Sequence, residues 1–121
     1  MDDSEDSEYE RRLLHYLGML KEEDPSQRWK AAEGLARLGD ERAVDPLIDA
    51  LADDDWRVRQ KAAWALGQIG DPRALLPLRR ALLQESEGVK EIILESLESI
   101  KRMNRNRFPH TKITLCNNSG R

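Results

Sequence analysis

The sequence predicts an all-α protein built from three stacked helical pairs, and three observations support this fold class. A repeat of 31 residues runs through the chain, because residues 23–53 and 54–84 share 14 identities where unrelated segments would share roughly two. Apolar residues within the repeat recur at helical spacing. The composition is 39% hydrophobic, 36% charged and only 5% aromatic. The core must therefore be thin and made of Ala, Leu, Ile and Val.

The apolar frame of the repeat predicts the first helix, at 8–21. Moving the repeat back by 31 residues aligns three leucines of this segment with apolar residues of the next unit. Residues 1–7 are acidic and polar, so we expect them to be flexible, or at most an extended start of this helix. The aligned pairs are Leu13 with Val44, Leu17 with Ile48, and Leu20 with Leu51.

Glycines and aspartates mark the ends of the middle helices. Gly39 and Gly70 tolerate the positive φ that follows a helix end. Asp40 and Asp71 can accept hydrogen bonds from the free amides of the next helix, and Pro72 suits a first helical position. These signals predict helices at 25–38, 41–52, 56–69 and 72–84.

Two prolines and two acidic turns complete the pattern. Pro46 and Pro77 should lie about one turn inside their helices and bend them. The acidic turns at 53–55 and 85–87 suit the positive N-terminal end of the following helix. The apolar frame then persists through a last helix at 87–102, where Val89, Ile93, Leu97 and Ile100 match Val58, Ala62, Leu66 and Ile69. The repeat domain is therefore expected at 8–102, in units of 8–39, 40–70 and 71–102.

The segment 103–121 loses the repeat and is basic and polar. We expect a disordered tail, because one short apolar run buries little area against the entropy of ordering it. The alternative is that the tail folds back over Leu94 of the last helix, with Phe108, Ile113 and Leu115 as the cover.

Residues 41–71, ERAVDPLIDALADDDWRVRQKAAWALGQIGD, resemble the short HEAT-like repeat of the phycobilisome-lyase group. The resemblance covers about 8–101 and is clearest in 24–84. It implies a right-handed α-solenoid in which the second helix of each pair lines the concave face. It also implies protein binding, although members of the group differ widely in activity.

The second helices place polar and aromatic residues opposite their core stripe. Tryptophan covers a large area at little entropic cost, so tryptophans beside Arg and Lys indicate a contact patch. The alternative is that the rings are buried between helices, in space left by Ala63 and Gly67. The predicted partner-binding residues are Trp29, Lys30, Glu33, Arg37, Trp56, Arg57, Gln60, Lys61, Trp64, Gln68, Glu91 and Glu95.

A second set of repeated charges has a structural interpretation. Arg28, Arg59 and Lys90 recur at the repeat spacing together with Asp24 and Asp55. We interpret them as a ladder of ion pairs between units rather than as a ligand site.

The residues needed for catalysis or metal binding are sparse. His15 and His110 are far apart, and neither precedes a glutamate, whereas a HEAT-repeat hydroxylase family builds its di-iron centre from His-Glu dipeptides. Cys116 has no associated base. We therefore expect a non-enzyme without a cofactor or metal. The single cysteine and the absence of a signal peptide or long apolar run favour a soluble, cytoplasmic setting.

Three function classes follow from these observations. The first is an interaction module or scaffold that binds a protein partner, as a monomer or a weak end-to-end dimer. The second is a subunit that handles a bilin, as a lyase or chromophore chaperone of the phycobilisome-lyase type. The third, a nucleic-acid-binding solenoid, is disfavoured because residues 11–100 carry 14 bases against 17 acids, and because Glu33, Glu87, Glu91 and Glu95 oppose a basic concave wall. No membrane partner is expected.

Overall fold

The structure of the protein is a computed structural model that describes residues 2–107, with side chains described for residues 7–105. These residues form six α-helices and two short 3₁₀ turns, and no strand occurs among them. The all-α prediction is confirmed. The elements are α1 (Asp2–Met19), α2 (Pro25–Leu38), η1 (Glu41–Ala43), α3 (Val44–Ala50), α4 (Trp56–Ile69), η2 (Pro72–Ala74), α5 (Leu75–Leu82) and α6 (Glu87–Arg107).

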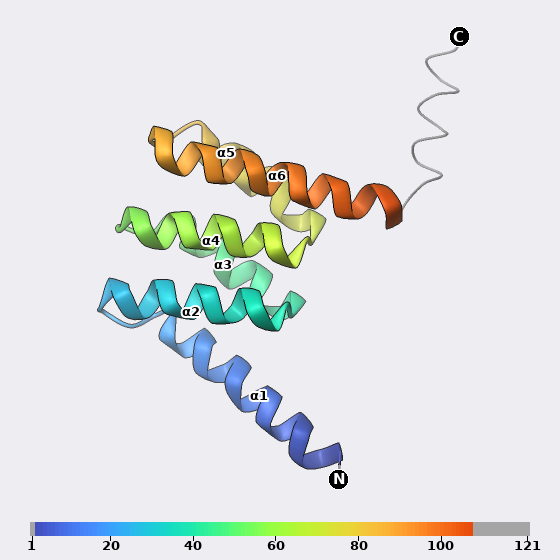
Figure 1. Cartoon of the computed structure of the whole chain (residues 1–121). Helices are drawn as coiled ribbons and strands as arrows, with labels where there is room; N and C mark the ends of the chain where they lie inside the picture. The colour runs from blue at the N-terminus through green and yellow to red at the C-terminus, as the bar shows by residue number, and fades with distance from the viewer. Residues whose placement is uncertain (1, 108–121) are drawn as a thin grey trace.

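The helices stack in two layers, as an α-solenoid does. Helices α2, α4 and α6 lie side by side in one layer, and α3 and α5 lie behind them (Figure 1). Each rear helix packs against the front helix that follows it in the chain, α3 against α4 and α5 against α6. The apolar core lies between the layers and contains the buried residues Leu35, Val44, Leu47, Leu66, Leu78, Val89, Ile93 and Ile100.

Helix α1 takes a different position from α3 and α5. It crosses obliquely beside α2, at the edge of the front layer away from α4 (Figure 1). A Cβ added at Gly34 of α2 would overlap the ring of Tyr16, so α1 covers this edge closely. The helix begins at Asp2, which agrees with the expected alternative of an extended start before residue 8. Acidic residues favour this position because the N-terminal end of a helix is positive.

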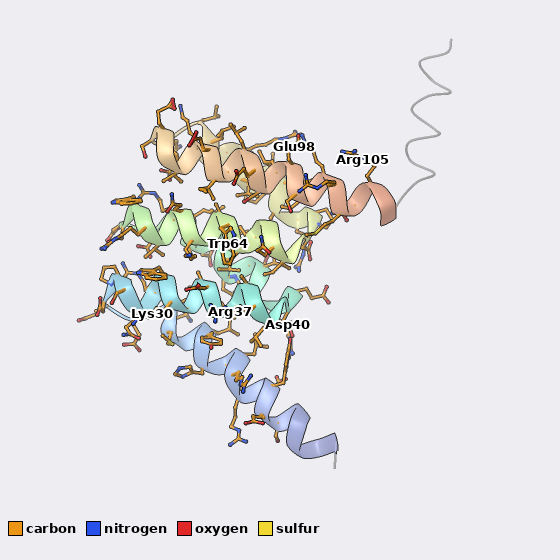
Figure 2. All side chains as sticks on the ribbon, viewed as in Figure 1. Lys30, Arg37, Asp40, Trp64, Glu98 and Arg105 are labelled. Carbon is orange, nitrogen blue, oxygen red and sulfur yellow. The ribbon has the colours of Figure 1, made fainter. Side chains whose placement is uncertain are left out.

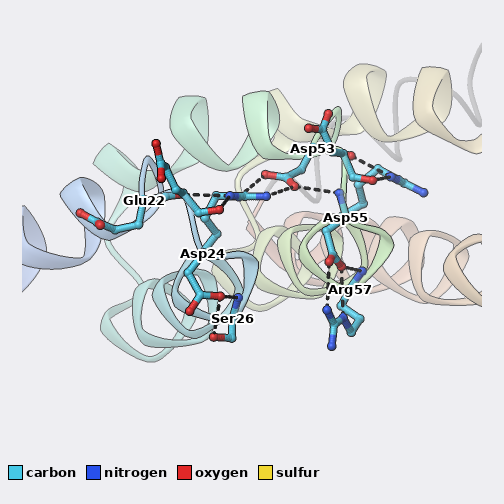
Figure 3. Close-up of polar contacts among 10 residues, drawn as sticks. Glu22, Asp24, Ser26, Asp53, Asp55 and Arg57 are labelled. Carbon is cyan, nitrogen blue, oxygen red and sulfur yellow. Dashed lines mark hydrogen bonds and ion pairs between the residues drawn. The ribbon is translucent and has the colours of Figure 1, made fainter.

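The predicted capping residues occupy the positions expected of them. Gly39 and Gly70 have φ values of 66° and 79°, and their N–H groups bond to carbonyls of the preceding turn. Four aspartates accept a hydrogen bond from the backbone N–H two residues further on, at the start of α2, η1, α4 and η2. They are Asp24, Asp40, Asp55 and Asp71; the caps formed by Asp24 and Asp55 are visible in Figure 3.

The helices expected at 41–52 and 72–84 are shorter than predicted. Each begins as a 3₁₀ turn and becomes α-helical only at Val44 or Leu75. Pro46 and Pro77 are therefore the third residues of α3 and α5. The first four N–H groups of an α-helix have no partner within it, so these prolines remove no helical bond and need not bend the axis.

Helix α6 is longer than predicted and ends at Arg107 instead of residue 102. The Asn104 side-chain amide donates to the carbonyls of Gly70, at 2.9 Å, and Ile100, at 2.7 Å. The Met103 side chain packs at Gly70. These contacts with the end of α4 stabilise the extra turn, so residues 103–107, which were expected in the tail, belong to α6. Phe108, Ile113 and Leu115 lie outside the described residues.

Candidate protein-binding face

The twelve predicted partner-binding residues lie on α2, α4 and α6, and none of them is buried. We call them together the second-helix face. Figure 2 shows Lys30 and Arg37 on α2 and Trp64 on the viewer's side of α4. Seven of the twelve are exposed and five are half-buried. The exposed residues are Lys30, Arg37, Trp56, Arg57, Gln68, Glu91 and Glu95; the half-buried ones are Trp29, Glu33, Gln60, Lys61 and Trp64.

Trp64 and Trp29 are joined through a lysine. The Lys61 ammonium nitrogen lies 4.9 Å from the Trp64 ring centroid and 5.2 Å from that of Trp29. Both distances fall within the range of cation–π attraction. Because Trp29 belongs to α2 and the other two residues to α4, this contact links two front helices. It also restrains Trp64, which packs at the margin of the core.

Trp56 has a different environment. It is the first residue of α4 and 53% of its surface is exposed. An exposed indole of this size is an apolar surface that a partner can cover. The three tryptophans therefore differ in exposure, because Trp56 is exposed whereas Trp29 and Trp64 are half-buried.

Small residues let α4 and α6 approach closely. A Cβ added at Gly67 would lie 2.8 Å from the Ser96 Oγ and 2.9 Å from the Ser96 Cα, closer than packed carbon atoms come. The Ser96 hydroxyl donates to the Ala63 carbonyl at 2.7 Å, and the Ser99 hydroxyl donates to the Gly67 carbonyl at 3.1 Å. Because the two helices are close and the residues between them are small, the surface there forms a depression bordered by larger side chains.

Two hollows lie on this part of the surface, and Trp64 borders both. The larger measures about 530 Å³, and its lining includes Trp64, Gly67, Gln68, Leu94, Glu95 and Arg102. The smaller measures about 130 Å³ and is lined by Gln60, Lys61, Trp64 and Ile92. Glu98 also lines the larger hollow. Sequence reasoning missed Glu98 and Arg102, because the 31-residue shift aligns them with Gly67 and the cap Asp71.

Two of the basic residues on the face are already paired. Arg57 bonds to Asp55 at 3.0 Å, and Arg37 bonds to Glu33 at 3.2 Å. The Arg57 guanidinium and backbone N–H lower the pKa of Asp55 to about 2, and Asp55 in turn raises the pKa of Arg57. Within the described part of the chain, Lys30, Glu91 and Glu95 form no ion pair.

Two ion pairs lie at the N-terminal ends of the second helices, and the predicted ladder is confirmed only for Arg28 and Arg59. Arg28 makes a two-pronged bond to Asp53, at 2.8 and 2.9 Å, and Arg59 bonds to Glu85 at 2.6 Å. The acids are not those expected, because Asp24 and Asp55 cap their own helices instead. Figure 3 shows Asp53 beside the capped start of α4. Lys90 forms no ion pair with the residues described.

Of the two histidines and the cysteine, only His15 lies within the described residues. Residues 2–107 contain no group of three or more His, Cys, Asp or Glu side chains placed to hold a metal ion. His15 is exposed on α1, whereas His110 and Cys116 lie outside the described range. No helix of this range is long and apolar enough to span a bilayer.

The stacked helical pairs and their exposed second-helix face define a repeat protein of the α-solenoid class. The chain belongs to the HEAT-repeat family, because the family model described as HEAT repeats matches residues 10–98. The HEAT-like part of the sequence resemblance is thereby confirmed. No curated protein matches the chain.

Proposed function

We propose that this protein is a non-catalytic interaction module, or scaffold, that binds a segment of a partner protein across the second-helix face. HEAT repeats commonly act as protein-interaction scaffolds, and a stack of this kind presents an extended surface for such contacts. The observation that carries the proposal is the position of Trp64, which lies half-buried on the middle front helix and borders both hollows.

The restraint on Trp64 supports this role. An anchor residue contributes most to binding when its conformation is fixed before the partner arrives, because less entropy is then lost on association. The Lys61 ammonium and the packing at the core margin restrain the Trp64 ring, while the hollows leave space beside it. Apolar side chains of a partner can fill that space and bury the rest of the ring.

The residues around Trp64 have the composition that is typical of a protein–protein interface. Protein interfaces combine an aromatic centre with a polar rim. Here the exposed residues Gln68 and Glu95 border the larger hollow, and Lys30 lies exposed on the neighbouring front helix. The rim provides hydrogen-bonding groups around an apolar centre, as recognition of a peptide segment requires.

Affinity capture with two variants tests the proposal. The wild-type chain and a Trp64→Ala variant are used to capture proteins, which are then identified by mass spectrometry. Leu76→Ala is the matched control, because Leu76 is a 54% exposed apolar residue on the rear helix α5. We expect proteins bound by the wild type and by Leu76→Ala to be lost with Trp64→Ala, while circular dichroism shows that all three are folded. Equal capture by Trp64→Ala would contradict the proposal.

The sequence resemblance also raised a bilin-handling subunit as the alternative. It rests on that resemblance, and no contact among the described residues specifically favours it. Adding a bilin to the purified chain distinguishes the two functions. If the visible absorbance of the bilin is unchanged, the result agrees with a module for protein binding. If the absorbance band of the bilin shifts, the result supports the bilin-handling function.

A further inference from the structure

Helix α6 carries a row of four glutamates along one side, which we call the acidic ridge: Glu87, Glu91, Glu95 and Glu98. Their spacing of four, four and three residues places them on one face of a helix. All four are exposed, and in the described structure none of them forms an ion pair.

The ridge has no structural counterpart in the preceding unit. The 31-residue shift aligns its four glutamates with Trp56, Gln60, Trp64 and Gly67 of α4, so the solenoid does not need acids at these positions. Several acids elsewhere in the repeat domain have roles in the fold. Asp24, Asp40 and Asp55 cap helices, and Asp53 and Glu85 receive the ladder arginines.

Folding alone does not favour this arrangement. Like charges four residues apart on a helix repel each other, at a cost of about 0.2–0.5 kcal/mol per pair. The helix dipole compensates for this only in the first turn, which contains Glu87 but neither Glu95 nor Glu98. A partner of opposite charge would relieve the repulsion.

The ridge borders the candidate binding surface. Glu95 and Glu98 line the larger hollow together with Trp64 and Leu94, whose side chain is 51% exposed. Figure 2 shows Trp64 on α4 and Glu98 on α6. Arg102 is the basic residue in this lining, and it lies on the C-terminal side of the ridge. Negative charge is therefore concentrated along α6 from Glu87 to Glu98, and its C-terminal end borders the hollow beside Trp64.

We propose that the partner segment is basic, with two or three Lys or Arg side chains along the acidic ridge and an apolar side chain in the hollow beside Trp64. This inference rests on the proposed function and adds the chemistry of the partner. The ridge from Glu87 to Glu98 is about 17 Å long at the rise of an α-helix. An extended segment of about five residues spans that length. The same charges oppose binding of nucleic acid, a polyanion.

Two short peptides and two charge variants test the inference. The probes are a five-residue peptide that alternates lysine and leucine and its counterpart that alternates glutamate and leucine, both fluorescently labelled. One variant combines Glu91→Gln, Glu95→Gln and Glu98→Gln. The matched control combines Glu22→Gln, Glu23→Gln and Glu41→Gln, which removes the same charge from exposed residues away from α6.

We expect the lysine peptide to bind the wild type and the glutamate peptide not to bind. Loss of the three ridge charges should weaken lysine-peptide binding about tenfold, because three rim-exposed ion pairs are lost. The control should change it less than twofold, and added salt should weaken binding to the wild type. Thermal unfolding should show that the ridge variant is at least as stable as the wild type, because it has less internal repulsion.

Equal binding of the two peptides to the wild type would overturn the inference, as would an equal loss of affinity in the ridge and control variants. Failure of the lysine peptide to bind would overturn it as well. None of these results bears on the proposed function, which the capture experiment with Trp64→Ala tests independently.

Discussion

Gly67 determines how closely α4 and α6 pack. Its missing side chain leaves room for Ser96, whose Oγ would lie 2.8 Å from an added Cβ. We predict that Gly67→Ala lowers the free energy of unfolding by about 1–3 kcal/mol, because the overlap includes backbone that must move. Urea unfolding followed by circular dichroism measures the change.

Gly18 provides the control for that substitution. It also lies within a helix, but an added Cβ would meet nothing within 4 Å. Gly18→Ala should leave stability unchanged or raise it by up to about 1 kcal/mol, because alanine favours the helix. Equal losses for the two variants would show that Gly67 has no special packing role.

The capping aspartates make stability depend on pH. In the folded chain, hydrogen bonds from Arg42 and its N–H lower the pKa of Asp40, and those from Arg57 and its N–H lower the pKa of Asp55 to about 2. The unfolded value is about 3.8. The stabilisation is therefore present above that value and is lost as the pH falls through the folded pKa.

We therefore predict that the free energy of unfolding falls between about pH 4 and pH 2. A variant with Asp40→Asn and Asp55→Asn should show a smaller fall, because asparagine still caps a helix but does not titrate. Urea unfolding at a series of pH values measures both. Equal falls in the two proteins would show that other carboxylates dominate the acid response.

At the residue scale, the sequence predicted a set of second-helix side chains, none of which is buried in the structure, but it did not predict what these side chains contact. Helical periodicity fixes the side of a helix on which a residue lies. It does not fix rotamers, so it could not predict that the Lys61 ammonium lies near both the Trp29 and the Trp64 rings. It also predicted the wrong acids for the ladder, because Asp24 and Asp55 bond to their own helix amides first.

At the element scale, Arg28 connects the N-terminal ends of the front helices α2 and α4. Its guanidinium binds Asp53 through two nitrogens and also donates to the carbonyls of Glu22 and Glu23, at 2.8 Å each. The arginine and aspartate side chains are only 14% and 13% exposed. We predict that Arg28→Ala destabilises the fold by about 2 kcal/mol, since it leaves a largely buried carboxylate and two carbonyls without their partner.

Arg37→Ala serves as the matched variant for Arg28→Ala. Arg37 pairs with Glu33 one helical turn away, and its side chain is 76% exposed. Such pairs contribute little, so we expect no measurable change in the midpoint of urea unfolding. A loss of stability as large as that of Arg28→Ala would contradict the view that the ladder holds the units together.

The helices themselves were predictable to different degrees. The second helices α2 and α4 have the bounds expected from the sequence, because aspartate caps and glycine ends are local signals. Helices α3 and α5 were predicted too long, since the repeat pattern does not distinguish a 3₁₀ turn from an α-helix. The end of α6 was missed because it depends on the bonds from Asn104 to Gly70 and Ile100, and Gly70 is 34 residues away.

At the scale of the whole molecule, the two sides of the described stack differ from its middle. On one side, α1 crosses α2 and places Tyr16 over Gly34. On the other, the 31-residue shift aligns Leu94 and Glu98 of α6 with the buried Ala63 and Gly67 of α4. A large apolar group and a charge thus occupy positions where small residues allow stacking in the middle. The repeat predicted the stacking of units, but the path of α1 depends on contacts outside the repeat pattern.

The candidate face spans three units, so it belongs to the whole molecule rather than to one helix. The proposed function requires that a partner segment binds beside Trp64. The most direct test is to follow the three indole N–H signals by NMR, each assigned by replacing one tryptophan with phenylalanine, while a captured partner segment is added. We predict that the Trp64 signal and the backbone amides of α4 and α6 shift together. Shifts confined to α3 and α5, with the Trp64 signal unchanged, would contradict the claim.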